Sequence, residues 1–282
     1  MPPEPPDGGQ RAADQLVALL DLEPIETDIF RGGNPESTPL SFVFGGQVAA
    51  QALMAAGRTV DPDRGVHSLH AYFIRRGDPT IPIVFTVDRI RDGQSFSMRR
   101  VLAVQHGQGI FSLSASFQLA QPGVDHQAPM PVAPGPDAAL ESDGYAELQQ
   151  LYRRVWPFER RPVPSADRPG EPRQNLVWMK ATGRLPDDPL LQACALTYAS
   201  DLTPVVSILQ INDIDRAELD VRTASLDHAV WFHRPGRADE WLLYESESPS
   251  ASGSRGLAIT RVFSMDGRQV ASTAQEGMIR IR

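Results

Sequence analysis

The sequence predicts an α+β protein made of two similar halves, each an antiparallel sheet curled around one buried helix. Residues 69–75 (LHAYFIR) resemble residues 227–234 (DHAVWFHR), and the segments that follow each of them also correspond. Each half contains a helical segment that is apolar on nearly every face, as expected for a helix enclosed by other elements. The 282 residues are enough for two halves of this size.

The first half reads as one helix followed by strands. Residues 45–60 (GGQVAAQALMAAGRTV) predict the helix, and their many alanines indicate that the sheet wraps closely around it. Asp92-Gly93 and the Gly-Gln-Gly of 107–109 supply hairpin turns between the later strands. The strands are expected at 67–75, 83–91, 96–106 and 110–118.

The second half repeats this order when His70 is aligned with His228. Residues 189–200 (PLLQACALTYAS) predict its buried helix, and Asp266-Gly267 is its strongest turn signal. The strands are expected at 223–234, 240–247, 256–265 and 269–281. The edges of the two sheets are expected to join into one continuous sheet.

Proline marks the boundaries of these halves, which are expected at 15–119 and 173–282. Four prolines in the first six residues predict a disordered N-terminal arm over 1–14. Proline also interrupts 120–172, which is expected to be a linker laid over the surface, with a short helical pattern at 145–156.

Composition excludes several classes of protein. A single cysteine, Cys194, rules out an internal disulfide and a thiolate metal cluster. The net charge of −8 argues against nucleic acid as a partner. The sequence contains no run of 18 apolar residues, so no membrane-spanning helix is expected. The N-terminus lacks the basic and apolar regions of a secretory signal, so a cytoplasmic protein is expected.

Known motifs for nucleophilic, nucleotide and metal chemistry are absent from the sequence. It has no GxSxG elbow, no GxxxxGK[ST] loop and no strand-linked GxGxxG. His67 and His70 are three residues apart in a strand, and His228 and His233 are five apart, so each pair points to opposite faces. No metal and no cofactor are therefore expected.

Asp201 is the first candidate catalytic residue, because the two halves differ there. The second buried helix is followed by Asp201, where the first helix has Arg58. A carboxylate at a helix C-terminus opposes the helix dipole, and partial burial would raise its pKa. From spacing alone, Asp201 is either a general base or an Asx or N-cap residue of the next turn, Asp-Leu-Thr-Pro.

Ser225 and Gln275 are the other two positions where a polar residue distinguishes the second half. The alignment matches Ser225 with His67 and Gln275 with Ala115. Each is also explained as an ordinary polar residue of a strand. Together with Asp201 they supply a base, a hydroxyl and an amide, which are the groups needed to hold and deprotonate one water molecule.

Four segments of the chain resemble the acyl-CoA thioesterase II (TesB-like) family. They are 44–52 (FGGQVAAQA), 198–201 (YASD), 226–234 (LDHAVWFHR) and 274–277 (AQEG), and the resemblance extends from about residue 15 to the end. It implies a double hotdog fold and hydrolysis of acyl-CoA thioesters. In that family an Asp, a Thr or Ser and a Gln orient the attacking water, which implies these roles for Asp201, Ser225 and Gln275.

The expected reaction is direct attack of water on a fatty acyl-CoA, without a covalent intermediate. The N-terminus of the first helix, Gly45-Gly46, is either an oxyanion site or only a helix start. Arginine pairs that could meet the CoA phosphates at the rim are Arg75-Arg76, Arg99-Arg100 and Arg160-Arg161.

Two alternatives to hydrolysis remain open at this point. They are an acyl-CoA hydratase, although residues 201–204 lack the histidine of its loop, and a non-catalytic acyl-CoA-binding module. The resemblance also implies a homo-oligomer, either a dimer or a tetramer of double hotdogs.

Overall fold

The computed structural model describes residues 8–35, 40–138, 156–163, 174–214 and 219–281. The described part of the first half contains two helices and six strands. In chain order they are α1 (Gly8–Leu20), β1 (Glu23–Glu26), β2 (Ile29–Gly32), α2 (Gly45–Gly57), β3 (Arg64–Phe73), β4 (Ile83–Asp92), β5 (Phe96–Gln105) and β6 (Gln108–Leu119).

The second half contains two described helices and seven described strands. They are β7 (Phe158–Val163), β8 (Gln174–Ala181), α4 (Pro189–Ser200), α5 (Pro204–Ile211), β9 (Val221–Ser225), β10 (Asp227–Phe232), β11 (Leu242–Ser252), β12 (Arg255–Ser264) and β13 (Gln269–Ile281). Both predicted core helices and the predicted strands are present, with the segment expected at 223–234 divided into β9 and β10.

All described strands belong to one antiparallel sheet. Its order is β1-β2-β4-β5-β6-β3-β10-β13-β12-β11-β8-β7, and β9 pairs with β13. The two halves meet at β3 and β10, where His70 lies opposite Ala229. The expected continuous sheet is thus confirmed, and its order on one side of this junction mirrors the order on the other.

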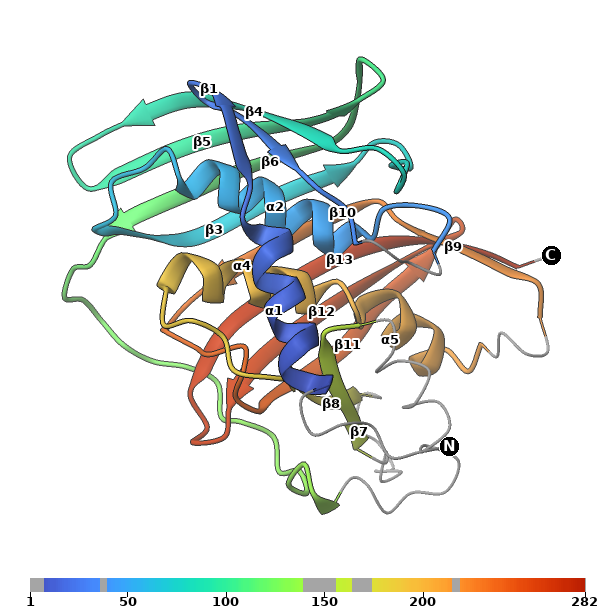
Figure 1. Cartoon of the computed structure of the whole chain (residues 1–282). Helices are drawn as coiled ribbons and strands as arrows, with labels where there is room; N and C mark the ends of the chain where they lie inside the picture. The colour runs from blue at the N-terminus through green and yellow to red at the C-terminus, as the bar shows by residue number, and fades with distance from the viewer. Residues whose placement is uncertain (1–7, 36–39, 139–155, 164–173, 215–218, 282) are drawn as a thin grey trace.

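The sheet curves around α2 and α4, which pack against each other on its concave face, and α1 packs across both (Figure 1). The two central helices run antiparallel, because Gly46 lies against the carbonyl oxygen of Tyr198 and Gly57 lies against Leu190. Every α2 residue from Gly46 to Ala56 is buried. Its small side chains allow this close enclosure, as the all-round apolar pattern predicted.

The structure differs from the expected organisation at the N-terminus, at the two ends of the sheet and in the linker. Residues 8–14 belong to α1, whose apolar residues Ala13, Leu16 and Leu20 enter the core, so they are not part of a disordered arm. The hairpins β1–β2 and β7–β8, which extend the sheet at its two ends, were not predicted, and β7 lies inside the expected linker. The helical pattern at 145–156 lies outside the described residues, apart from Trp156.

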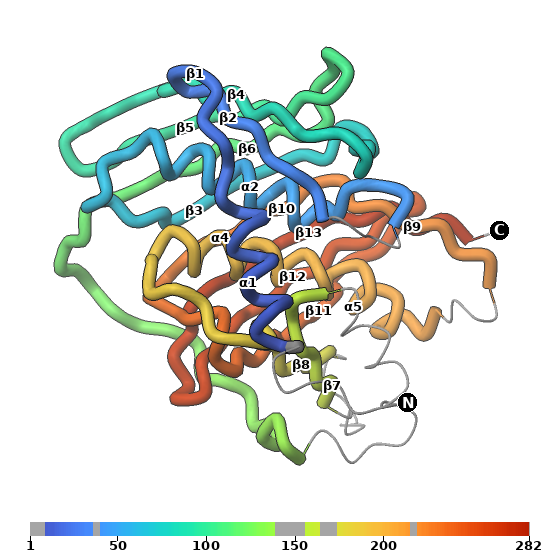
Figure 2. Tube along the Cα trace, viewed as in Figure 1, coloured from blue at the N-terminus to red at the C-terminus, as the bar shows by residue number. Residues whose placement is uncertain are grey.

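Residues 120–138 run from the end of β6 along the second half, as the green part of the trace in Figure 2 shows. The side chain of Gln127 donates to the carbonyl oxygen of Gly267 at 2.7 Å and accepts from the backbone N–H of Gln269 at 2.9 Å. Further along, the indole of Trp178 donates to the carbonyl oxygen of Pro134 at 2.8 Å. This segment therefore covers part of the outer face of the second half.

The stretch Pro189–Ile211 is apolar and long enough to cross a membrane by length and composition, but 72% of its most apolar window is buried inside the molecule. It is not one continuous helix, because α4 ends at Ser200 and α5 begins at Pro204. Its hydropathy is accounted for by its position in the core.

The internal repeat is present, but its alignment shifts by one residue in β3 and β10. The backbone N–H groups of Ile74 and Arg75 both donate to one carbonyl oxygen of β6, and those of His233 and Arg234 both donate to one of β13. Aligning these bonds places Leu69, rather than His70, at the position of His228. Burial agrees, because His228 is buried while His70 is exposed. A one-residue shift moves a side chain to the other face of the sheet.

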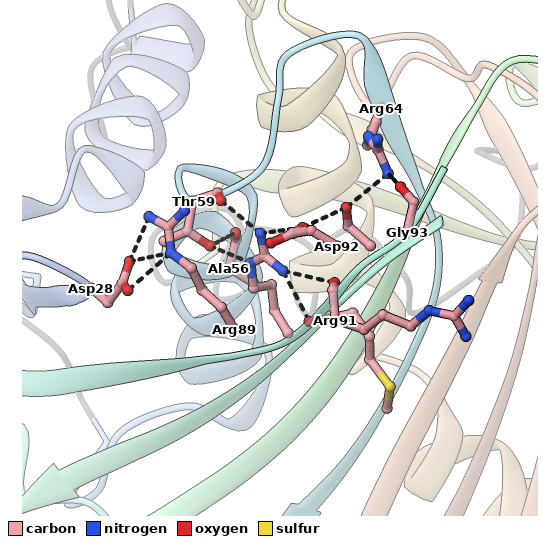
Figure 3. Close-up of polar contacts among 11 residues, drawn as sticks. Asp28, Ala56, Thr59, Arg64, Arg89, Arg91, Asp92 and Gly93 are labelled. Atoms are coloured by element: carbon pink, nitrogen blue, oxygen red, sulfur yellow. Dashed lines mark hydrogen bonds and ion pairs between the residues drawn. The ribbon is translucent and has the colours of Figure 1, made fainter. Parts of the chain in front are cut away.

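Arg99 is buried at the C-terminal end of α2, which corrects its expected place on the rim. The guanidinium donates to the hydroxyl and carbonyl oxygens of Thr59 at 2.8 and 2.9 Å and to the carboxylate of Asp92 at 2.7 Å. It also donates to the carbonyl oxygens of Arg91 and Met98. Figure 3 shows Thr59, Arg91 and Asp92 in this network.

Replacing Arg99 by Leu is expected to lower the free energy of unfolding by about 3 kcal/mol or more, because the buried hydroxyl and carbonyl oxygens of Thr59 lose their donor. Urea unfolding measures this loss. Arg100→Leu is the control: Arg100 is on the same strand but exposed and paired with the exposed Asp88, so a change within about 1 kcal/mol is expected. Equal losses for the two variants would contradict the structural role of Arg99.

Candidate active site

Asp201 ends α4 as its C-cap residue, and the chain then turns into α5. The N-cap of α5 is Thr203, so Asp201 is not the N-cap residue of that helix. The carbonyl end of a helix disfavours a carboxylate, and α4 therefore gives Asp201 no electrostatic support. Support has to come from neighbouring elements.

The N-terminus of α2 provides part of this support. The backbone N–H of Gly46 donates a hydrogen bond to the Asp201 carboxylate, which acts to lower the pKa of that group. At Gly45 a Cβ atom would lie 2.6 Å from Asp201 Oδ2 and 2.7 Å from the ring of Phe73. Glycine at this position thus allows the helix end to approach the carboxylate closely.

Gln275 and Ser225 complete the cluster from the sheet. Gln275 lies on β13 and has 1% of its surface exposed, whereas Ser225 ends β9 and stays partly exposed. The Gln275 amide nitrogen donates to Asp201 Oδ1 at 2.9 Å and to Ser225 Oγ at 2.7 Å. The structure thus brings together all three residues singled out in the sequence, and Gln275 is not a surface residue.

A β-bulge gives Ser225 its position. Ser225 lies opposite Gly277 on β13, while Ala229 lies opposite Ala274, so the β9–β10 segment has one residue more than β13 over this stretch. The first half has the same irregularity, because Val66 lies opposite Phe117 and the next pairing begins at Ser68. An extra residue of this kind redirects neighbouring side chains.

Burial raises the pKa of Asp201 to about 7, and this effect exceeds the opposing hydrogen bonds from Gln275, Gly46 and Ser225. A carboxyl group with this pKa exchanges its proton near neutral pH, unlike an ordinary aspartate. The cluster therefore contains a base, a hydroxyl and an amide around one perturbed carboxylate. Such a group in a partly accessible site is a candidate general base.

The corresponding place in the first half has no such cluster. The equivalents are Arg58 at the C-cap of α2, Val66 before the bulge, and Ala115 on β6. The corrected alignment thus matches Ser225 with Val66 rather than with His67. The inner face beside Ala115 is occupied by Arg99, which lies directly opposite it on β5. Within the described residues, this constellation occurs once in the chain.

The remaining arginine candidates differ in exposure. Arg160 is buried, and Arg161 is held by Glu159 and Asp137, so neither lies free on a rim. Arg75 and Arg76 are exposed, and the guanidinium of Arg76 lies 5.1 Å from the ring centre of Phe42, shortly before α2.

No group of three or more His, Cys, Asp or Glu side chains suited to a metal ion occurs in the described part of the chain. Sequence reasoning missed the buried His228, whose ring lies next to this cluster. The sequence signal that could have pointed to His228 is its position in the segment 226–234, one of the four segments that resemble the thioesterase family. From the sequence, His228 is either a metal ligand or a core or rim residue with satisfied hydrogen bonds, and its neighbours across the sheet cannot be derived from spacing.

Comparison with known proteins identifies the family. A protein-family model described as acyl-CoA thioesterase matches residues 148–278, and a second family model, described as acyl-CoA thioesterase N-terminal domain, matches residues 34–118. Acyl-coenzyme A thioesterase 8 of Homo sapiens is 38% identical over 312 residues, which cover 99% of this chain and 97% of the human protein. The chain belongs to the acyl-CoA thioesterase family.

Solved structures of related proteins agree with this assignment. An acyl-CoA thioesterase II, TesB2, from Mycobacterium marinum has a TM-score of 0.82 and 47% identity, covering 95% of this chain and 98% of that one. A protein from Alicyclobacillus acidocaldarius described as having a hot dog fold has a TM-score of 0.75 at 21% identity, covering 94% and 98% of the two chains. The predicted double hotdog fold and family resemblance are confirmed.

For this thioesterase, kcat/KM is expected to rise with pH and to level off above an apparent pKa of about 7, because Asp201 must lose its proton to act as a base. A pH–rate profile, with circular dichroism at each pH to confirm folding, measures this. An acid limb near pH 4, the ordinary range of an aspartate, would contradict the assignment.

Proposed function

We propose that this thioesterase hydrolyses fatty acyl-CoA by direct attack of water, with Asp201 as general base and Ser225 and Gln275 orienting the water. The observation that supports this proposal is the hydrogen-bonded contact of the three side chains around a carboxylate whose pKa is about 7. A base acts best when its pKa lies near the working pH.

The reaction balances with these groups alone. Water adds its oxygen to the thioester carbon and gives its proton to Asp201. The resulting oxyanion collapses, the carbon–sulfur bond breaks, and CoA leaves as a thiolate. Asp201 then returns its proton to the products, so the enzyme ends as it began. A thiolate is a good leaving group, which limits the acid catalysis that the site must supply.

The oxyanion needs hydrogen-bond donors, and the first turn of α2 is placed to provide them. The first N–H groups of a helix have no partner within the helix, and its dipole favours negative charge there. Phe44 caps α2 without a side-chain hydrogen bond to these groups. Gly46 donates to Asp201, so the neighbouring N–H groups of the turn are the candidates for the oxyanion.

The alternatives carry less support. A hydratase of this fold would place a histidine after the Asp-Leu-Thr-Pro turn, but Val205 and Val206 follow there and begin α5. A binding module would not require a perturbed carboxylate in contact with a hydroxyl and an amide. A cytoplasmic location and a dimeric or tetrameric assembly stay predictions from the sequence.

Replacing Asp201 by Asn is expected to lower kcat by about 10²–10⁴-fold with KM within a few-fold, since the base is lost while the shape is kept. Release of free CoA from palmitoyl-CoA, followed with a thiol reagent, measures this. Asp88→Asn, an exposed carboxylate on β4, is the matched control and should keep full activity. Unchanged turnover in a folded Asp201→Asn enzyme would contradict the proposal, and absence of CoA release by the wild type would refute hydrolysis itself.

A further inference from the structure

We propose that His228 is a positioning residue, which orients the side-chain amide of Gln275 so that its NH2 group faces Asp201 and Ser225. This inference rests on the proposed function, because His228 acts only through Gln275. It assigns a role to a buried histidine that the reaction itself does not use.

His228 and Gln275 lie side by side on neighbouring strands. Strands β10 and β13 pair with Ala229 opposite Ala274, which places the next residues, His228 and Gln275, next to each other on the inner face. Each has 1% of its surface exposed. Buried polar atoms of this kind are costly without hydrogen bonds, so their partners determine how both side chains are oriented.

The atoms left over on the two side chains match each other. The Gln275 NH2 group uses its two hydrogens on Asp201 and Ser225. Its Oε1 atom and the Nδ1 atom of His228 are both buried, and neither has a hydrogen-bond partner among the described residues. A polar contact with Gln275 acts to raise the pKa of His228, although burial outweighs it and lowers that pKa to about 4.

The other side of the imidazole ring determines where its proton lies. Ser200 Oγ lies 2.8 Å from His228 Nε2, and it is also placed to donate to the carbonyl oxygen of Thr197 at 2.9 Å. A serine hydroxyl has one hydrogen, so it can donate to only one of these two atoms. We assign that hydrogen to Nε2, because the neutral ring then has its proton on Nδ1, beside the buried Gln275 Oε1 atom that has no other donor among the described residues. The opposite tautomer would set two lone pairs against each other.

A carboxamide group can adopt two orientations that exchange the places of its oxygen and its nitrogen, and this arrangement favours one of them for Gln275. A flipped Gln275 would present its carbonyl oxygen to the Asp201 carboxylate, which repels it, and could not donate to Ser225. A donor at His228 Nδ1 binds the carbonyl oxygen and so favours the productive orientation. The ring thus links the last residues of α4 to the amide that contacts Asp201.

The first half of the chain shows that the fold does not require a histidine here. The position equivalent to His228 is Leu69, which is fully buried, and the position equivalent to Gln275 is Ala115, which lies opposite it. Histidine is therefore present in the half that has the glutamine, and leucine in the half that lacks it. Replacing His228 by Leu is consequently expected to leave the sheet folded.

The test compares His228→Leu with His228→Asn, whose amide nitrogen can replace the Nδ1 donor. We expect kcat of the Leu variant to fall about tenfold, the effect of one lost hydrogen bond, with KM within twofold, and the Asn variant to recover much of the loss. In a Gln275→Ala background, His228→Leu should change kcat by less than about twofold, because residues acting through one group are not additive. His67→Leu, which removes another histidine–serine contact, is the control and should keep kcat.

Wild-type kcat in His228→Leu, or an equal further loss in the Gln275→Ala background, would overturn the role of His228. An Asn variant as impaired as the Leu variant, with an unchanged melting temperature, would do the same. Full activity in Gln275→Ala alone would instead overturn the proposed function of the site. If the variants do not fold, ¹⁵N NMR of the wild-type ring decides: a proton on Nδ1 supports the inference, and a proton on Nε2 overturns it.

Discussion

The contact between the N-terminus of α2 and the carboxylate that ends α4 is the interaction on which the site depends. A carboxylate at a helix C-terminus is electrostatically disfavoured, but here it meets the opposite end of an antiparallel helix from the other half. The glycine pair at 45–46 makes this approach possible. The proposed catalytic cluster therefore depends on both halves, although its three side chains all come from the second.

The two halves place equivalent positions at two such junctions, and the polar cluster is found at one of them. Each half places a helix C-cap, a bulged strand and an inner-face residue at the same relative positions. In the second half these positions are polar and face a shared point. In the first they are Arg58, Val66 and Ala115, and Arg99 fills the adjacent inner face with bonds to α2. The first half thus contributes a helix end and stability rather than reacting groups.

Much of this arrangement could be predicted from the sequence, because its signals are local. The all-apolar helices, the strand alternation and the difference between Arg58 and Asp201 are each visible within a short window. The one-residue shift in the alignment of the two halves at His70 could not be predicted in this way, because it depends on a bulge that only the pairing of strands reveals. The same is true of β7 in a proline-rich segment, of Arg99 in the interior, and of His228 beside Gln275: each depends on neighbours distant in sequence.

The central claim is that Asp201 activates water and does not itself attack the thioester. A single turnover in H₂¹⁸O, with enzyme in excess over palmitoyl-CoA, tests this directly by mass spectrometry of the fatty acid and of the peptide that contains Asp201. Direct attack predicts one ¹⁸O atom in the released fatty acid and none in Asp201. Label in the Asp201 carboxyl group together with an unlabelled fatty acid would show a covalent aspartyl intermediate and contradict the account.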